Sequence, residues 1–352
     1  MLRIFGDDNG SDDGRCMKIL IIGPAWIGDM IMAQTLFKRL KTEHPGCEID
    51  VLAPDWTKPL LDRMPEVRQA VSMPIGHGQL KLLARYRIGR QLRDKYDWAI
   101  VLPNSFKSAL IPFFARIPKR TGFVGECRYG LLNDVIKLDK QKYPLMVERF
   151  VLLGGALPKK YEWPKLIAKK PDLENVDLTK KILALCPGAA FGPAKRWPYF
   201  GELANLCLND DWQVWLFGSN ADAEIANEIN AKTNNRCVDL TGQTNLARAI
   251  DLLSVVSAVV TNDSGLMHVA CALDRRVIAL YGSSSPDFTP PLSEHAKKLW
   301  LHIECSPCFE RVCPLKHFNC MRKLSVEMVV SQLRADKTHA VTGLEQLRAA
   351  QD

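Results

Sequence analysis

The stretch AVVTNDSGLMH, from Ala258 to His268, marks the passage from a strand into a helix. The apolar run before it ends in β-branched residues, which favour a strand, and Leu266 to Leu273 has the pattern of a short helix. Asp263 or Ser264 can cap that helix, whose first amides are free. These amides favour an anionic ligand, and Gly265 lets it come close to the backbone. The stretch therefore predicts either a phosphate-binding turn or an ordinary helix cap.

Strand and helix patterns alternate along the rest of the chain. Apolar strand runs occur in two series, at Lys18–Ile22, Glu48–Ala53 and Trp98–Leu102, and then at Ile182–Cys186, Gln213–Phe217, Ala258–Thr261 and Val277–Tyr281. Helical patterns between such runs favour parallel sheets with crossover helices. The fold class is therefore predicted as α/β, with two Rossmann-like, doubly wound domains whose strand C-termini face a central cleft.

The length of 352 residues suits two domains better than a single α/β core. Residues 1–16 are rich in aspartate and glycine and lack the features of a secretory signal, so we expect a disordered extension, with Met17 as an alternative translation start. Prolines, lysines and scattered apolar residues between the two strand series predict a linker. The expected boundaries are 17–165 for the first domain, 166–180 for the linker, 181–324 for the second domain and 325–352 for C-terminal helices.

Composition limits the class of protein. Hydrophobic residues make up 47% and charged residues 24%, and no apolar run approaches the roughly 20 residues that cross a bilayer. The net charge of +8 fits an acidic partner, but charges of both signs are mixed along the chain, unlike a nucleic-acid-binding tail. The basic stretch Lys81–Lys95 is expected to be a solvated helix. Without an export signal, we expect a cytoplasmic protein whose 11 cysteines are mostly reduced.

The first strand ends in GPAWIGD, from Gly23 to Asp29. This loop is not a P-loop, because Asp29 stands where the phosphate-binding lysine belongs, and it lacks the G-x-G-x-x-G spacing of a dinucleotide site. At the mouth of the cleft, Asp29 can take a proton from a hydroxyl as a general base. It can also cap the helix that begins at Met30, and one residue could do both.

A second glycine loop, CPGAAFGPAKRWP from Cys186 to Pro198, opens the second domain. Its cations Lys195 and Arg196 suit a pyrophosphate, because they can neutralise charge on a leaving phosphate. A basic surface turn is the alternative. In the loop FGSNADAE, Glu224 could reach a ribose hydroxyl, although acidic residues are also common in the first turn of a helix.

In the first domain, LPNSFKSAL follows a strand, and Lys107 with Arg120 and Arg128 offers cations to an anionic acceptor. Each of these could equally be a solvated surface charge. Near the C-terminus, one C-x-x-C pair and two further thiols could close a tetrahedral metal site, although their spacing is irregular for a zinc ribbon. Reduced thiols or a local disulfide are the alternatives. The four residues are Cys305, Cys308, Cys313 and Cys320.

From about Met17 to Pro291, the chain resembles the ADP-heptose:lipopolysaccharide heptosyltransferases. The resemblance rests on five motifs that occur in the same order as in that family: GPAWIGD, LPNSFKSAL, CPGAAFGPAKRWP, TNDSGLMH and LYGSSSPDFTPP. That family is similar to glycosyltransferases of the GT-B fold. The resemblance implies a GT-B-like pair of domains, a donor bound mainly by the second one, and a C-terminal segment, within 325–352, that crosses back to the first.

The resemblance also implies roles for particular residues. Asp29 would be the general base and Lys195 would bind the donor pyrophosphate, so these two are the expected catalytic residues. The other expected donor-binding residues are Arg196, Glu224, Thr244, Asp263, Ser264, Gly265 and His268. The expected acceptor-binding residues are Asn104, Ser105, Lys107, Arg120 and Arg128.

The implied reaction is the inverting transfer of L-glycero-D-manno-heptose from ADP-L-glycero-β-D-manno-heptose to the first heptose of the lipopolysaccharide inner core. No metal or other cofactor would be needed for this chemistry, no nucleic acid would take part, and the enzyme would work at the cytoplasmic face of the inner membrane, peripherally attached. Alternatives are a transferase for the first or a later heptose, a nucleotide-sugar epimerase, or a non-catalytic protein that binds nucleotide sugars.

Overall fold

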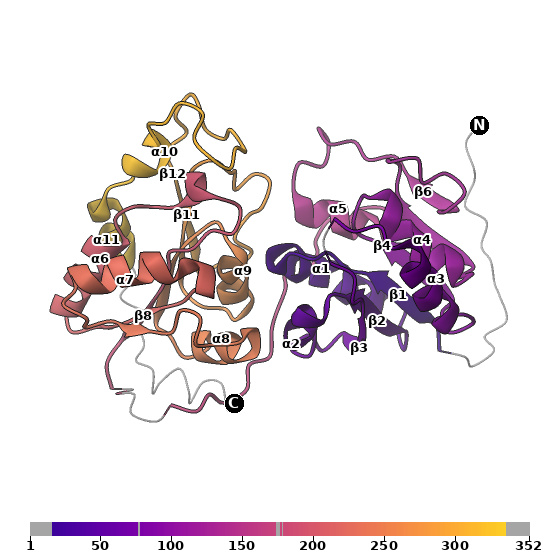
Figure 1. The fold of residues 1–352 in the computed structure, drawn as a ribbon, viewed down its shortest axis with the longest axis horizontal. Helices are drawn as coiled ribbons and strands as arrows, with labels where there is room; N and C mark the ends of the chain where they lie inside the picture. The colour runs from indigo at the N-terminus through magenta and orange to yellow at the C-terminus, as the bar shows by residue number, and fades with distance from the viewer. Residues whose placement is uncertain (1–15, 77, 174–176, 178, 336–352) are drawn as a thin grey trace.

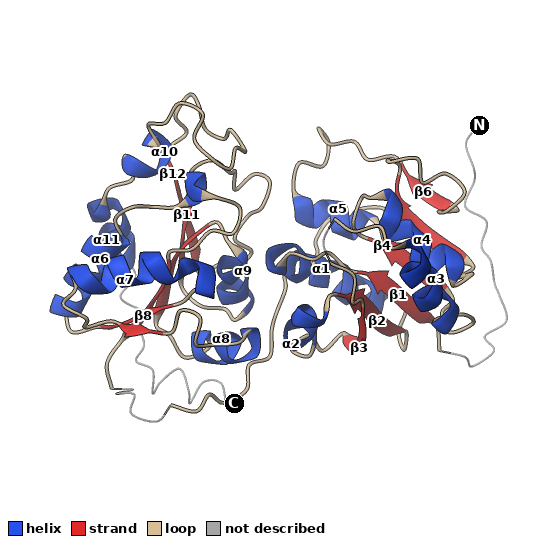
Figure 2. Ribbon diagram, viewed as in Figure 1, coloured by secondary structure: helices blue, strands red, loops and turns tan. Residues whose placement is uncertain are grey.

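The computed structural model describes residues 16–76, 78–173, 177 and 179–335. Two halves, each built on one parallel six-stranded sheet with helices around it, follow one another along the chain (Figures 1 and 2). The prediction of an α/β fold with two doubly wound units is confirmed. The extension expected at residues 1–16 lies, apart from Cys16, outside the described residues. None of the helices in the described part is both long and apolar enough to cross a membrane.

The first sheet has the order β3-β2-β1-β4-β5-β6. Its strands are β1 (Lys18–Ile22), β2 (Glu48–Ala53), β3 (Val67–Ser72), β4 (Trp98–Val101), β5 (Lys119–Phe123) and β6 (Asp134–Ile136). Its helices are α1 (Ile27–Glu43), α2 (Lys58–Leu61), α3 (Leu82–Gln91), α4 (Phe106–Phe114) and α5 (Met146–Leu152), with a 3-10 turn, η1 (Asp55–Thr57). In β1, Ile19 and Ile21 belong to one apolar cluster and Leu20 and Ile22 to another, so both faces of the sheet are covered.

The second sheet repeats this plan with the order β12-β11-β10-β7-β8-β9. Its strands are β7 (Ile182–Cys186), β8 (Gln213–Leu216), β9 (Val238–Asp239), β10 (Ala258–Asn262), β11 (Val277–Tyr281) and β12 (Ala296–Trp300). Its helices are α6 (Phe200–Asn209), α7 (Ala223–Lys232), α8 (Leu246–Leu253), α9 (Gly265–Ala272), α10 (Asn319–Arg322) and α11 (Val326–Ala335), with the 3-10 turns η2 (Pro193–Lys195) and η3 (Asn220–Asp222). In each half the first strand is central, so the order reverses beside it, which is where doubly wound sheets bind ligands.

The two halves meet through α1 and α9, which face each other in Figure 1. Two glycines allow this close approach. A Cβ atom on Gly265 would lie 2.9 Å from the Cβ of Ile27, and one on Gly28 would lie 2.6 Å from Cδ2 of His268. Because the helices pack near their first turns, the ends of β1 and β10 are brought toward each other.

The segment between the halves is tied to both of them. The Gln34 side chain donates to the carbonyl of Lys165 at 2.7 Å and accepts from its amide at 3.0 Å. Arg63 of the first half pairs with Asp251 of α8 at 2.6 Å, and Asp251 also accepts from the amide of Lys169 at 2.8 Å. These polar contacts stabilise one relative placement of the two sheets.

The C-terminal part of the described chain packs on the second half. The indole of Trp197 donates to the carbonyl of Leu324 at 2.8 Å, and α11 lies against α6 and β11. The return to the first half, predicted within 325–352, does not begin before Ala335, the last described residue of α11. The remainder of that segment lies outside the described residues.

Candidate functional site

Asp29 lies in the first turn of α1, directly after the loop that ends β1. Its carboxyl group is partly buried at the junction of the two halves. Burial raises the pKa of Asp29 to about 6; the carboxylate of Asp263 adds to the rise and the ammonium of Lys195 opposes it. A carboxylate with a pKa near neutrality holds a proton better than an ordinary aspartate, which suits a general base.

Lys195 and Asp263 form a close ion pair within the second half. Lys195 ends the turn η2 after β7, Asp263 follows β10, and Lys195 Nζ lies 2.5 Å from Asp263 Oδ2. The ammonium also lies 4.9 Å from the centre of the Phe191 ring. Since both charges act on Asp29, the structure brings together three of the predicted site residues in one electrostatic cluster.

His268 lies on α9 beside this cluster and is only 4% exposed. Its ring packs on Gly28 of the opposite half. Burial lowers the pKa of His268 to about 4. Asp263 raises this pKa and Lys195 lowers it, both to a smaller extent than burial, so the imidazole is neutral near pH 7. The visible role of His268 is therefore contact between the halves, and the predicted contact with a donor stays a prediction.

The turn before α9 is organised by a residue that the sequence reading did not select. Asn262 accepts a hydrogen bond from the amide of Trp197 at 3.1 Å and donates to the carbonyl of Pro187 at 2.7 Å. Ser264 occupies the N-cap position, but its side chain makes no capping hydrogen bond. The ordinary helix cap, which was the alternative interpretation of this stretch, is thus not formed by the Ser264 side chain. The first backbone amides of α9, from Gly265 onward, therefore remain available to an anionic ligand.

The remaining predicted donor residues follow β7, β8 and β9 at the same edge of the sheet. Arg196 points toward Asp222, with 4.0 Å between Nη2 and Oδ1. Asp222, rather than Glu224, makes the reciprocal capping contacts with Ser219, and Glu224 is exposed in the first turn of α7. Thr244 is partly buried in the loop before α8.

Several buried polar atoms at this edge lack a partner among the described residues. Unpartnered polar atoms are uncommon in protein interiors, and a ligand is one way to satisfy them. All follow strands of the second sheet, and two of them belong to the LYGSSSPDFTPP motif, which was recognised without any of its serines being selected. They are Arg196 Nε, Thr241 Oγ1, Ser283 Oγ and Ser284 Oγ.

A cavity of about 1230 Å³ opens in the first half beside Asp29. Three predicted acceptor residues, Asn104, Ser105 and Lys107, line it. The walls also include side chains that the sequence did not indicate as acceptor residues. They come from distant parts of the chain, and only the folded structure brings them around the same cavity. The most notable are Trp26, Trp56, Arg85, Lys140 and Arg149.

The other two predicted acceptor residues do not line this cavity. Arg128 is 2% exposed and donates to the carbonyl of Pro103 at 3.0 Å and to the side chain of Asn104. Arg120 donates to the carbonyl of Leu131 at 2.7 Å. Burial lowers the pKa of both guanidinium groups. Arg128 thus holds residues that line the cavity, and Arg120 holds the chain around Leu131 outside it, whereas both were expected to offer free cations.

Arg149 is a cation of the cavity that is positioned by both halves. It lies on α5, and its Nε donates to the carbonyl of Tyr143 at 2.9 Å. Its guanidinium lies 5.0 Å from the centre of the Phe288 ring, which belongs to the second half, and the Phe288 carbonyl accepts from the amide of Met146 at 2.9 Å. The orientation of this cation therefore depends on contact between the halves.

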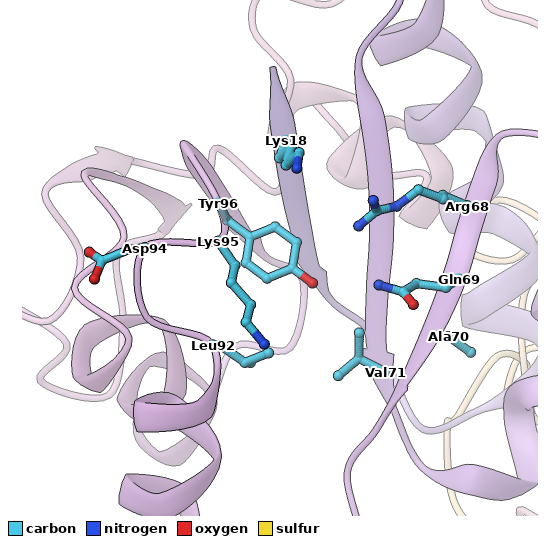
Figure 3. Close-up of a pocket in the computed structure, with 9 residues that line it drawn as sticks. All are labelled: Lys18, Arg68, Gln69, Ala70, Val71, Leu92, Asp94, Lys95 and Tyr96. Carbon is cyan, nitrogen blue, oxygen red and sulfur yellow. The ribbon is translucent and has the colours of Figure 1, made fainter. Parts of the chain in front are cut away.

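A second cavity of about 400 Å³ lies beside the first residue of β1. Figure 3 shows Lys18, Arg68 and Tyr96 around it. Arg68 and Tyr96 both bond the buried carboxylate of Asp50, at 2.5 and 2.7 Å. Arg68, Tyr96 and Asp50 satisfy one another, and the cavity lies at the start of β1, whereas Asp29 follows the end of that strand. This cavity is therefore not the candidate site.

The cysteine-rich segment near the C-terminus has four free thiols, at Cys305, Cys308, Cys313 and Cys320. Burial, together with the three neighbouring thiols, raises the pKa of Cys320 to about 11. Within the described part of the chain, no group of three or more His, Cys, Asp or Glu side chains is placed to hold a metal ion. The structure therefore gives no support to the metal site considered from the spacing.

This segment instead packs on the loops of the second sheet. The amide of Ala194 donates to the carbonyl of Arg311 at 3.0 Å, next to Lys195. The amide of Phe309 donates to the carbonyl of Ser283 at 2.6 Å. A Cβ atom on Gly192 would overlap the Arg311 carbonyl oxygen, so glycine is needed for this contact. The cysteine-rich segment thus holds two loops of the candidate site.

Comparison with known proteins gives a consistent result. The model of glycosyltransferase family 9 (heptosyltransferase) matches residues 85–319. The chain is 52% identical over 307 residues to lipopolysaccharide heptosyltransferase 2 of Salmonella typhimurium and 50% identical to that of Escherichia coli, in both cases over 81% of this chain and 88% of the relative. The solved structure of E. coli ADP-heptose lps heptosyltransferase II superposes with a TM-score of 0.79 at 45% identity, over 91% of this chain and 98% of that one. By sequence and by fold, the chain belongs to glycosyltransferase family 9, the heptosyltransferases.

Proposed function

We propose that this protein is an inverting glycosyltransferase that moves L-glycero-D-manno-heptose from ADP-heptose to the first heptose of the lipopolysaccharide inner core. The observation that carries the proposal is the position of Asp29, between a large cavity in the first half and the Lys195–Asp263 pair in the second. The relatives that share about half of its residues are named lipopolysaccharide heptosyltransferase 2, which supports this proposal.

In the proposed reaction, Asp29 takes the proton of the acceptor hydroxyl while the oxygen attacks the anomeric carbon of the heptose. The new glycosidic bond forms on the face opposite the bond to ADP, which breaks with its electron pair on the diphosphate. A partly desolvated carboxylate suits this role, because its raised pKa strengthens it as a base. Inversion follows from the single displacement.

The departing diphosphate needs positive charge and hydrogen-bond donors in place of bulk water. Lys195 supplies the charge, and Asp263 orients its ammonium through the contact at 2.5 Å. The first amides of α9, beginning at Gly265, point from the same edge. Fixed donors of this kind stabilise charge that develops in the transition state. With Arg196, Ser283 and the other unpartnered groups, this edge is the proposed donor site.

The cavity beside Asp29 is the proposed acceptor site. Its volume of about 1230 Å³ accommodates a sugar that is part of a larger molecule. Lys107 and Arg149 supply cations for the acidic groups of a lipopolysaccharide core, while Trp26 and Trp56 supply broad apolar walls. We place the reaction at the cytoplasmic face of the inner membrane, where such an acceptor is anchored by its lipid.

A panel of acceptors tests the proposal. Purified protein is incubated with ADP-heptose and lipid acceptors that carry zero, one or two heptoses, and products are identified by mass spectrometry. We expect transfer to the acceptor with one heptose and ADP release in equal amount. Preferred use of either other acceptor would reassign the enzyme to a different heptose of the core.

Two further samples separate other kinds of activity. ADP-heptose alone, without acceptor, should remain chemically unchanged apart from slow hydrolysis; conversion to an isomer would instead indicate an epimerase. Calorimetric binding of ADP with no product from any acceptor would indicate a protein that only binds the nucleotide sugar.

A further inference from the structure

Helices α3 and α4 lie side by side at the end of the first half that is remote from the second (Figures 1 and 2). Several large apolar side chains on and beside these helices are exposed. Leu83 is 74% exposed, and the ring of Tyr86 packs edge-on against Phe114 with 5.3 Å between centres. We call the following exposed set the α3–α4 surface: Leu80, Leu82, Leu83, Tyr86 and Phe113.

The packing of α3 explains why these leucines point outward. Gly89 faces α4 so closely that a Cβ atom there would lie 2.5 Å from the Cβ of Phe114. Arg85, one turn earlier on the same side, is buried. Positions four residues apart share a helix face, so the buried face is already occupied by Arg85 and Gly89. The apolar residues Leu82, Leu83 and Tyr86 therefore lie largely outside this buried face and are exposed.

The two chain segments that form the α3–α4 surface carry charges of a single sign, with exposed Asp94 just beyond the first and Glu126, which accepts from the Phe106 amide at 2.7 Å, beside the start of α4. Residues 79–93 contain five Lys or Arg and no Asp or Glu, and residues 104–120 contain four Lys or Arg and again no acid. Those exposed next to the apolar set are Lys81, Arg87, Arg90 and Arg116. A merely solvated basic helix, as the sequence suggested, does not account for the leucines. A surface that is both apolar and cationic matches an anionic bilayer, which offers acyl chains beneath phosphate groups.

The α3–α4 surface is continuous with the candidate acceptor cavity. Arg85 lines that cavity and donates to the carbonyl of Leu80 at 2.6 Å and to that of Lys107 at 3.1 Å. Lys107, at the start of α4, lines the same cavity. A bilayer bound to this surface would therefore lie beside the cavity's rim.

We propose that the α3–α4 surface binds an anionic phospholipid bilayer and so presents the acceptor cavity to a lipid-anchored substrate. The apolar side chains enter the boundary between head groups and acyl chains, and the surrounding cations contact lipid phosphates. This inference rests on the proposed function, because a membrane surface beside the cavity is useful only if the acceptor that enters the cavity is anchored in the membrane.

Flotation with vesicles tests the binding itself. Vesicles are made of phosphatidylethanolamine with or without phosphatidylglycerol, and the double variant Leu83→Gln/Arg87→Gln is compared with the unaltered protein. A matched control, Leu315→Gln/Lys316→Gln, removes an exposed leucine and an exposed lysine from the second half. We expect the unaltered protein and the control to bind the phosphatidylglycerol vesicles. The α3–α4 variant should bind them at least tenfold more weakly, since one cation alone contributes about fivefold near an anionic surface.

Three results would overturn the proposal: no binding by the unaltered protein, equal binding by the α3–α4 variant, or an equal loss in the control. Circular dichroism and thermal unfolding establish that the variants are folded, which the exposure of both altered side chains favours.

A transfer assay separates this inference from the proposed function. The α3–α4 variant should transfer heptose normally to a water-soluble, acyl-free core oligosaccharide and poorly to the intact acceptor in vesicles. Equal loss on both acceptors would place Leu83 and Arg87 in catalysis and contradict a membrane role. If even the unaltered protein fails on both acceptors, the proposed function fails, while the flotation result decides the membrane surface by itself.

Discussion

The two halves share one plan of parallel strands and yet treat the same edge of the sheet differently. In the first half the loops after the strands surround a cavity of about 1230 Å³. In the second half the corresponding loops are linked to one another, with Asn262 holding Pro187 and Trp197, and the cysteine-rich segment holding the loop at Ser283. The difference teaches that one topology can provide an open site for a large acceptor and a fixed set of donors for a small, charged leaving group.

In this comparison the general base, Asp29, belongs to the first half, whose loops surround the cavity. The replacement Asp29→Asn tests this assignment most directly. The amide keeps the shape of the side chain but cannot take a proton, so we expect kcat to fall by about 10²–10⁴. Steady-state transfer to the acceptor with one heptose measures it. Asp55→Asn, which alters another carboxylate that lines the cavity, is the control. An equal loss in the Asp55 variant, or near-normal rates in the Asp29 variant, would break the assignment.

The second test concerns the charge on the linked half. Lys195→Met removes the cation beside Asp263, and we expect kcat/KM to fall by about 10²-fold because the departing diphosphate loses its counter-charge. Asp263→Asn keeps the lysine but frees its ammonium, so its loss should be smaller. Lys180→Met, which breaks an exposed ion pair with Asp211 in the same half, should leave the rate unchanged. Normal rates in the Lys195 variant would contradict its role with the donor.

The pH dependence of kcat/KM tests the electrostatic contact between the halves. Asp29 is active only when ionised, and its pKa is raised to about 6, so activity should fall about tenfold per pH unit as the pH drops below that value. Replacing Asp263 by Asn removes one cause of the rise and should move the acidic limb to lower pH. An unchanged limb in that variant would show that the two carboxylates do not interact.

A smaller effect is expected where the second half orients a cation of the first. Arg149→Lys keeps the charge but loses the planar contact with Phe288, so we expect KM for the acceptor to rise about threefold to tenfold while kcat changes little. Phe288→Leu should act in the same direction. Lys142→Gln, an exposed cation of the same region, is the control. A rise in KM for ADP-heptose instead of the acceptor would move Arg149 to the donor side.

The smallest effect concerns stability at the contact of α1 with α9. The pKa of His268 is lowered to about 4 in the folded protein, so its neutral form is favoured there, and stability is lost as the pH falls from its ordinary value of 6.5 toward 4. The raised pKa of Asp29 acts in the opposite sense over the same range. In Asp29→Asn protein the acid-side loss should therefore be steeper, by about 1–3 kcal/mol in the free energy of unfolding. Parallel urea titrations of both proteins, from pH 7 to pH 4, measure it.

The central strands were predictable because their apolar runs are local features of the chain. β1, β2, β4, β7, β8, β10 and β11 were all expected at nearly these positions. β3, β5, β6 and β12 were missed. Of these, β3, β6 and β12 lie at sheet edges, where solvent contact permits polar residues such as Arg68 and Lys297. β9 has only two residues, too few for any pattern.

Charged residues were harder to assign than strands. Arg128 looked like a free surface cation, yet it is buried, and its Nη atoms donate to the carbonyl groups of Pro103 and Phe123. Those partners come from separate loops that only the folded sheet brings together. Arg149 gave no signal for the same reason, since its position depends on a phenylalanine almost 140 residues further along the chain.

The sequence by itself determined the α/β class, the loops that carry chemistry, and the resemblance that led to the heptosyltransferases, because strand runs and loop motifs depend on residues a few positions apart. The tertiary structure alone decided that Asp29 faces the Lys195–Asp263 pair, that Gly28 receives His268, and that a cavity opens beside the base. The first two of these relationships join residues more than 160 positions apart. They arise from how two separate sheets and their helices pack together, which no local sequence pattern reveals.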